Sequence, residues 1–129
     1  MWAENYVGLP FGEGAGEVTC WSLVVRVYAD QLGISLPAYG EISAHDLRRV
    51  AVTMGREQLG EHWRAVQPPQ AFDVAIMRSG RGGSLIKHVG VMVDEHRLLH
   101  VEEATASVIV PIGNFTVRAR IAGFRRYVS

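Results

Sequence analysis

The chain has 129 residues, of which 48% are hydrophobic and 20% charged, as expected for one globular domain with one core. Thirteen Lys and Arg residues balance thirteen Asp and Glu residues, so the formal net charge is zero. This balance argues against a nucleic-acid partner, which normally requires a basic excess. A single cysteine also excludes an internal disulfide, so the core alone must hold the fold.

The N-terminal sequence predicts no targeting segment. "MWAENYVGLPFGEG" has no basic region and no long apolar run, so it does not have the pattern of a signal peptide. No stretch of the chain approaches the length of a membrane span. We therefore expect synthesis in the cytoplasm, no membrane partner, and delivery by another agent if the protein acts outside the cell.

The first sixteen residues are rich in glycine, with Gly8, Gly12, Gly14 and Gly16 around Pro10, which predicts a loop. Their spacing matches neither a Walker phosphate loop nor a dinucleotide-binding fingerprint. We expect the glycines to let the backbone pass close to the core or to a ligand.

A helix is predicted over residues 19–32, because apolar residues recur there at helical spacing. Thr19 is the expected N-cap and Gly33 the expected C-terminal stop. A second helix is predicted to begin near Ser43, where the run through Asp46 has the form of a capping box.

After residue 60 the pattern becomes that of short strands separated by turns. The predicted strands are 62–66, 71–77, 88–93, 97–101, 107–112 and 116–128, and 79–83 is a predicted turn. Helices followed by strands predict an α+β domain, with N-terminal helices packed on an antiparallel sheet.

Cys20 lies one residue inside the predicted helix and allows two interpretations. A free cysteine is usually a small buried hydrophobic residue. A helix N-terminus, however, carries partial positive charge and unpaired N–H groups, which stabilise a thiolate and can donate to an oxyanion. This position makes Cys20 a candidate nucleophile.

Two of the five histidines are candidates for its base. His45, His62 and His96 are expected to be exposed, whereas His88 and His100 lie on the apolar arms of a predicted hairpin. An odd-numbered loop, such as residues 94–96, places these two on one face, and a two-residue loop places them on opposite faces. Each alone is most simply a half-buried core residue.

Together the two histidines predict a catalytic arrangement with Cys20. His88 would be the general base, and His100 would bond its other ring nitrogen. A zinc site formed by Cys20, His88 and His100 is the competing use of the same residues. Because no paired ligand motif supports it, we expect no metal and no cofactor.

Nearly the whole chain resembles the NlpC family of papain-like cell-wall cysteine peptidases, especially those encoded with phage tails and gene-transfer particles. The similar segments are "NYVGLPFGEG", "TCWSLVVRVYADQLGISLPAYG", "AFDVAIMRSG" and "HVGVMVDEHRLLHVEEATASVIV". The resemblance implies a papain-like fold, with Cys20 as nucleophile, His88 as base and His100 as orienting residue. It also implies that Tyr6 lines the site, and Thr19 and Trp21, on either side of the cysteine, are further candidate substrate contacts.

The resemblance implies a peptidase that cuts the peptide stem of peptidoglycan, for example between γ-D-glutamate and a diamino acid. It would act at the bacterial cell wall within a phage-like particle, beside other tail proteins. Three positions depart from the family pattern: Thr19 replaces Asp, Ser22 replaces Gly, and Phe72-Asp73 replaces Gly-Asp. A tail protein of this fold without activity, and a CHAP-type amidase, are therefore the alternatives.

Overall fold

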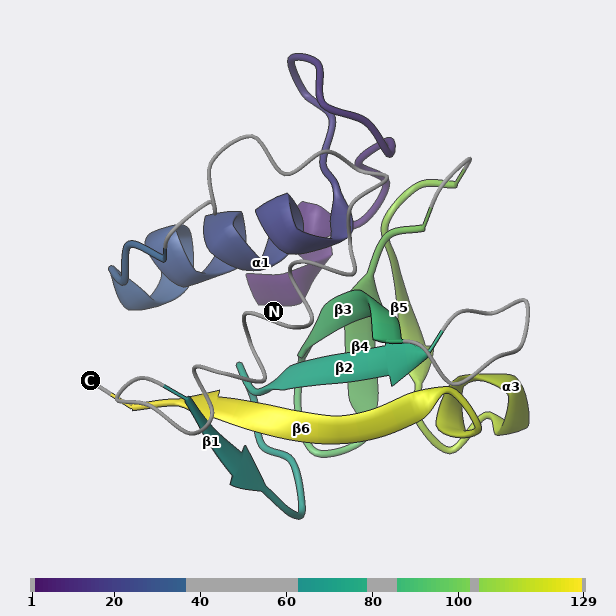
Figure 1. The fold of residues 1–129 in the computed structure, drawn as a ribbon. Helices are drawn as coiled ribbons and strands as arrows, with labels where there is room; N and C mark the ends of the chain where they lie inside the picture. Colours follow the sequence, from purple (N-terminus) through teal and green to yellow (C-terminus); the bar gives the residue numbers. More distant parts are fainter. Residues whose placement is uncertain (1, 37–62, 79–85, 103–104, 129) are drawn as a thin grey trace.

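The computed structural model describes residues 2–36, 63–78, 86–102 and 105–128. The six strands form one antiparallel sheet in the order β1-β6-β2-β3-β4-β5, and α1 lies across one face of it (Figure 1). This confirms the predicted α+β architecture. The elements in chain order are η1 (Trp2–Tyr6), α1 (Cys20–Val27), η2 (Tyr28–Leu32), β1 (Trp63–Val66), β2 (Val74–Arg78), β3 (Ile86–Met92), β4 (Arg97–His100), β5 (Val108–Pro111), α3 (Phe115–Arg118) and β6 (Ile121–Tyr127).

The first helix begins and ends at the residues that the sequence indicates. Thr19 is the N-cap of α1, and η2 continues the helix with π-type turns. Gly33 then stops it in a left-handed conformation, with φ of 65°. The second predicted helix, near Ser43, and the predicted turn at 79–83 lie outside the residues that the structure describes. No helix in the described ranges is both long and apolar enough to cross a membrane.

The sheet has an apolar core on each of its faces. Successive strand residues point to opposite faces: Val74 and Ile76 belong to the core that includes α1, whereas Ala75 and Met77 belong to a second core, which also includes Val117 of α3. The candidate site residues Cys20 and Tyr6 belong to the first core.

The chain after residue 113 differs from its prediction. A continuous strand over 116–128 was expected, but residues 115–118 form the helix α3 and the strand begins at Ile121. The Asn114 side chain caps this turn by accepting from the backbone N–H of Thr116 at 3.0 Å. The alternating apolar pattern around Val117 concealed this local cap.

The β3–β4 hairpin has the three-residue loop that the histidine prediction requires. Val91 pairs with Leu99 and Met92 with Leu98, and the Val93 N–H donates to the Arg97 carbonyl at 2.8 Å. Residues 94–96 are therefore the loop, and the Asp94 carboxylate accepts from the backbone N–H groups of His96 and Arg97. This register places His88 and His100 on the same face of the sheet.

Asp73 fixes the start of β2 against β6. Its carboxylate is 2% exposed and accepts two hydrogen bonds from Arg126, at 2.9 and 2.8 Å, and one from the Gln70 amide at 2.8 Å. A bidentate pair of this kind is directional as well as strong. The acidic residue in the "AFDVAIM" segment thus holds two central strands in register.

Phe72, which replaces the family's glycine, has a φ of 73°. This conformation favours glycine and costs other residues about 1–2 kcal/mol. The Phe72 ring compensates by stacking on Trp2, with ring centroids 4.7 Å apart, and its backbone N–H donates to the Met92 carbonyl at 2.8 Å.

This balance predicts an unusual order of stability for substitutions at position 72. We expect Phe72→Ala to be less stable than Phe72→Gly by about 1 kcal/mol, because both lose the ring contact and only glycine relieves the strain. Urea unfolding of both variants measures the difference. An alanine variant more stable than the glycine variant would contradict the strain.

Candidate active site

His88 and His100 form a buried pair joined by a direct hydrogen bond. Nε2 of His88 lies 2.7 Å from Nδ1 of His100, and each residue is 5% exposed. Gly90 makes room for this contact, because a Cβ at that position would lie 3.0 Å from the His100 Cβ and from the Leu99 carbonyl oxygen. Any larger residue at 90 would have to displace the second histidine.

The hydrogen bond assigns different roles to the two nitrogens of His88. Nε2 is used by His100, so Nδ1 is the nitrogen that can accept a proton. In the tautomer required for a base, Nε2–H donates to Nδ1 of His100. The same bond persists when His88 becomes an imidazolium, so the ring keeps its orientation through a proton transfer.

Cys20 is the first residue of α1 and lies against the strand that carries His88. The backbone amide of Val89, the residue next to His88, acts to lower the pKa of the Cys20 thiol, and Cys20 is 1% exposed. The structure therefore packs the start of α1, with Cys20, against the β3–β4 hairpin, in which His88 and His100 are in direct contact.

Burial keeps both Cys20 and His88 neutral. Burial raises the pKa of the Cys20 thiol to about 12, although the amides of Val89 and Trp21 act to lower it. Burial, with a smaller contribution from His100, lowers the pKa of His88 to about 3. The helix N-terminus acts in the expected direction, but burial outweighs it, so the thiolate expected from helix position alone does not form at rest.

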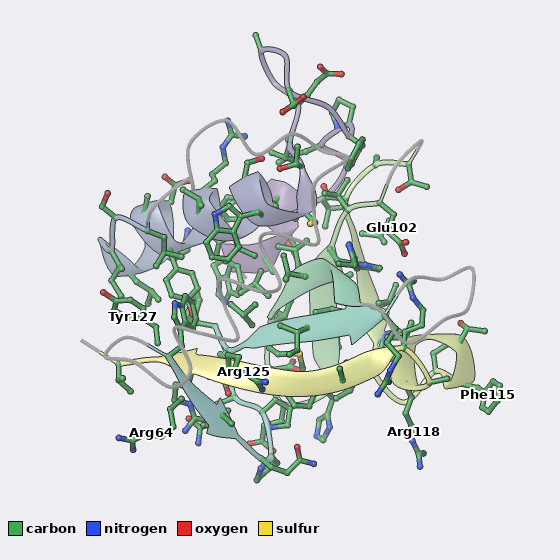
Figure 2. The ribbon with its side chains drawn as sticks, in the orientation of Figure 1. Arg64, Glu102, Phe115, Arg118, Arg125 and Tyr127 are labelled. Atoms are coloured by element: carbon green, nitrogen blue, oxygen red, sulfur yellow. The ribbon has the colours of Figure 1, made fainter. Side chains whose placement is uncertain are left out.

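Glu102 and Arg120 extend the histidine pair, and sequence reasoning missed both. The Glu102 carboxylate lies 3.8 Å from Nδ1 of His100 and accepts two hydrogen bonds from Arg120, at 2.7 and 3.0 Å. Figure 2 shows Glu102 beside the end of α1 at which the helix begins. Its signal was its spacing, because side chains two residues apart in extended chain share a face. Arg120 gave no local signal.

The zinc interpretation can be tested against the donor atoms. His88, His100 and Glu102 offer ligand atoms within 4.8 Å of one another, and this group does not include Cys20. The two histidine nitrogens are bonded directly to each other, and both carboxylate oxygens of Glu102 are bonded to Arg120. The geometry therefore favours a hydrogen-bonded catalytic set over the predicted zinc alternative.

The three candidate substrate contacts lie in different surroundings. Trp21 is buried and packs edge-on against Trp63, with centroids 6.5 Å apart. The Tyr6 hydroxyl donates to Asp30 at 2.8 Å and accepts from Gln31 at 3.2 Å, at the far end of the helix from Cys20. The structure thus directs the Tyr6 hydroxyl away from the nucleophile.

Thr19 remains beside Cys20, and its hydroxyl caps the helix. It accepts from the Ser22 N–H at 3.1 Å, while the Ser22 hydroxyl accepts from the Thr19 N–H at 2.7 Å. Two of the departures from the NlpC pattern are therefore reciprocal partners in one capping box. The helix that carries the nucleophile keeps its cap without the family's aspartate.

A separate hollow of about 680 Å³ lies at the second core. Its lining includes His96, Ile121 and Phe124, and none of the three candidate catalytic residues. His96 is exposed in the hairpin turn, as predicted.

The fold and site are those of an α+β domain with a buried cysteine–histidine centre. The family model described as "NlpC/P60 family" matches residues 8–126, and the chain belongs to this family. The predicted resemblance to NlpC proteins is confirmed at the level of the family.

Solved structures of this family share the fold. An NLP/P60 family protein from Staphylococcus aureus, described as similar to lipoprotein, has 21% identity and a TM-score of 0.64, and a Bacillus cereus NlpC/P60 family protein has 19% and 0.67. Each comparison covers 98% of this chain but only 39% and 38% of those chains. The NlpC/p60 domain of peptidoglycan hydrolase SagA has 15% identity and a TM-score of 0.57, over 95% of this chain and 90% of that one. No curated protein matches the chain.

The capping box predicts the effect of two substitutions at position 19. We expect Thr19→Val to lower the free energy of unfolding by about 1 kcal/mol, because the variant keeps the side-chain shape and loses the acceptor. Thr19→Asp keeps an acceptor at the N-cap and serves as the matched control, with a stability close to that of the wild type. Urea unfolding measures both, and equal stability of the valine variant would argue against the cap.

The raised pKa of Cys20 predicts slow alkylation of the native protein. At pH 8 we expect iodoacetamide to modify the folded chain more than about a hundredfold more slowly than the urea-unfolded chain, because burial suppresses both the thiolate and access to it. The folded-state rate should still be rising at pH 10. Mass spectrometry reports one site, since the chain has one cysteine. A fast plateau near neutral pH would instead indicate a resting thiolate–imidazolium pair.

Proposed function

We propose that the protein is a cysteine peptidase that hydrolyses the peptide stem of bacterial peptidoglycan, with Cys20, His88 and His100 as its catalytic residues. The observation that carries this proposal is the 2.7 Å bond between Nε2 of His88 and Nδ1 of His100, with the Cys20 sulfur at the neighbouring Val89 amide. Membership of the NlpC/P60 family, together with the likeness to a domain of a peptidoglycan hydrolase, supports the substrate class.

The neutral resting pair defines the first chemical step. When a substrate carbonyl reaches the sulfur, the thiol proton moves to Nδ1 of His88 as Sγ forms the new bond to carbon. Backbone N–H groups of the first turn of α1 would stabilise the oxyanion. The imidazolium then gives its proton to the leaving amine as the C–N bond breaks, and a thioester remains.

The second half returns the enzyme to its starting state. His88, neutral again, accepts a proton from water as the water oxygen attacks the thioester carbonyl. Collapse of that intermediate releases the new carboxylate product and a thiolate, which recovers its proton from His88. No cofactor enters the balance, and His100 accepts the same hydrogen bond throughout.

The bond between γ-D-glutamate and a diamino acid is the scissile bond that we propose. We further propose that the protein reaches the cell wall within a phage-like particle, in contact with other tail proteins. This assignment follows from the resemblance of the quoted segments. Mass spectrometry of muropeptide products distinguishes it from a CHAP-type amidase, because an amidase releases the whole stem from the sugar.

A second candidate function is a structural tail protein of the same fold without activity. The 1% exposure of Cys20 and its raised pKa favour this alternative, because a nucleophile must be reached by substrate and lose its proton. The peptidase would cleave muropeptides, whereas the structural tail protein would not.

The proposed activity predicts complete dependence on two side chains. Cys20→Ala and His88→Ala should each lower the rate of cleavage of a defined muropeptide by at least about a thousandfold. Residues of one catalytic unit act together, so losing either one removes most of the rate enhancement that the unit provides. Glu95→Gln, which changes an exposed residue of the β3–β4 loop, is the active control. Circular dichroism checks that each variant is folded. Undiminished turnover in either alanine variant would rule out this mechanism, and an inactive wild type would favour the structural alternative.

A further inference from the structure

Arg120 joins the Glu102 carboxylate to the end of β2 through three hydrogen bonds. Its Nη1 and Nη2 donate to the two carboxylate oxygens at 2.7 and 3.0 Å, and its Nε donates to the Arg78 carbonyl at 3.1 Å. The Arg78 N–H in turn donates to the Arg120 carbonyl at 2.7 Å. The end of β2 therefore fixes the guanidinium, and the guanidinium fixes the carboxylate.

The fixed carboxylate faces the histidine pair. Oε1 of Glu102 lies 3.8 Å from Nδ1 of His100, the atom that Nε2 of His88 contacts at 2.7 Å. A separation of 3.8 Å is too long for a hydrogen bond, so Glu102 acts on the histidines through its charge. The Glu102 side chain is 37% exposed, so solvent screens part of its charge, whereas the His100 side chain on which it acts is only 7% exposed.

We propose that Glu102, anchored by Arg120, is a positioning residue that stabilises the imidazolium formed on His88 and sets the pH range of the reaction. The inference rests on the proposed function, which assigns His88 as the base. The balance is simple: the Cys20 proton moves to Nδ1 of His88, and positive charge appears in the histidine pair. Glu102 stays ionised, because Arg120 occupies both of its oxygens, and no proton passes beyond His88.

The electrostatic contributions agree in sign with this geometry. Besides the larger effect of burial, Glu102 acts to raise the pKa of His88 and of His100, and Arg120 acts to lower both. Burial acts to raise the pKa of Glu102 itself, but the Arg120 hydrogen bond, together with His88, the Arg120 charge and His100, brings it below its usual value. Among the described residues, the charged and titratable groups that act on His88 are His100 from β4, Glu102 after β4 and Arg120 before β6.

The test compares charge removal with charge exchange in the pair. Glu102→Gln, Arg120→Gln and the double variant are assayed for the pH dependence of kcat/KM on a muropeptide. The profile has an acidic and a basic limb, each with its own pH midpoint. Removing the carboxylate should lower both midpoints by about 0.5–1 pH unit, and removing the guanidinium should raise both by a similar amount. The double variant has the same net charge as the wild-type pair and should return the limbs close to their original positions.

A merely structural pair gives a different pattern. All three variants would then lose activity or stability without shifting the limbs in opposite directions, and the double variant would be no better than the worse single variant. Either that pattern or unchanged limbs in both single variants would overturn the proposal. Glu95→Gln and Arg64→Gln remove exposed charges elsewhere and should leave the profile unchanged.

A second readout separates this inference from the proposed function. Iodoacetamide labels the single cysteine without any substrate, and its rate at pH 9, below the thiol pKa, should rise for Glu102→Gln and fall for Arg120→Gln, because these changes shift the thiol pKa down and up respectively. If the wild type cleaves no muropeptide, the proposed function fails, and the alkylation order alone decides the inference. Opposite shifts would support the charge pair, and equal or absent shifts would reject it.

Discussion

The register of the β3–β4 hairpin is the constraint on which the site depends. The three-residue loop at 94–96 sets Leu99 opposite Val91, and this alternation turns both histidines to one face. A slip of one residue would move His100 to the second core and leave His88 without its partner. Gly90 then allows the close approach, since a Cβ there would contact His100. Backbone pairing thus determines the orientation of the His88 ring through its contact with His100.

Burial is the second force that shapes the site, and it opposes the first. The core that holds Cys20 against β3 also removes the water that would solvate a thiolate and an imidazolium. The first-turn amides and the Val89 amide offset part of this cost at the sulfur. Glu102 offsets part of it at the histidines. The amides and Glu102 thus act against burial, which still leaves Cys20 and His88 neutral at rest.

The features that the sequence predicted correctly have local causes. A cap at Thr19, a left-handed stop at Gly33 and a polar three-residue turn were sufficient to predict α1, the hairpin and the proximity of the two histidines. The features that it missed depend on contacts distant in the chain. Arg120 reaches Glu102 only because the chain before β6 lies beside the end of β2, and the direction of Tyr6 depends on where η1 docks against η2.

The three departures from the family pattern are weak evidence that activity has been lost, because the structure compensates for each of them. Thr19 and Ser22 replace an aspartate and a glycine, yet together they form the two hydrogen bonds of a capping box. Phe72 replaces a glycine in a left-handed conformation, and its ring gains a stacking partner in Trp2. Each change is compensated by a neighbour, which is how a structural requirement is met by different residues. What the capping box does not replace is the negative charge of an aspartate beside the nucleophile. In its absence, among the described residues, Glu102 is the carboxylate whose charge acts on both Cys20 and His88, so the acidic influence on this site comes from the histidine side of the pair.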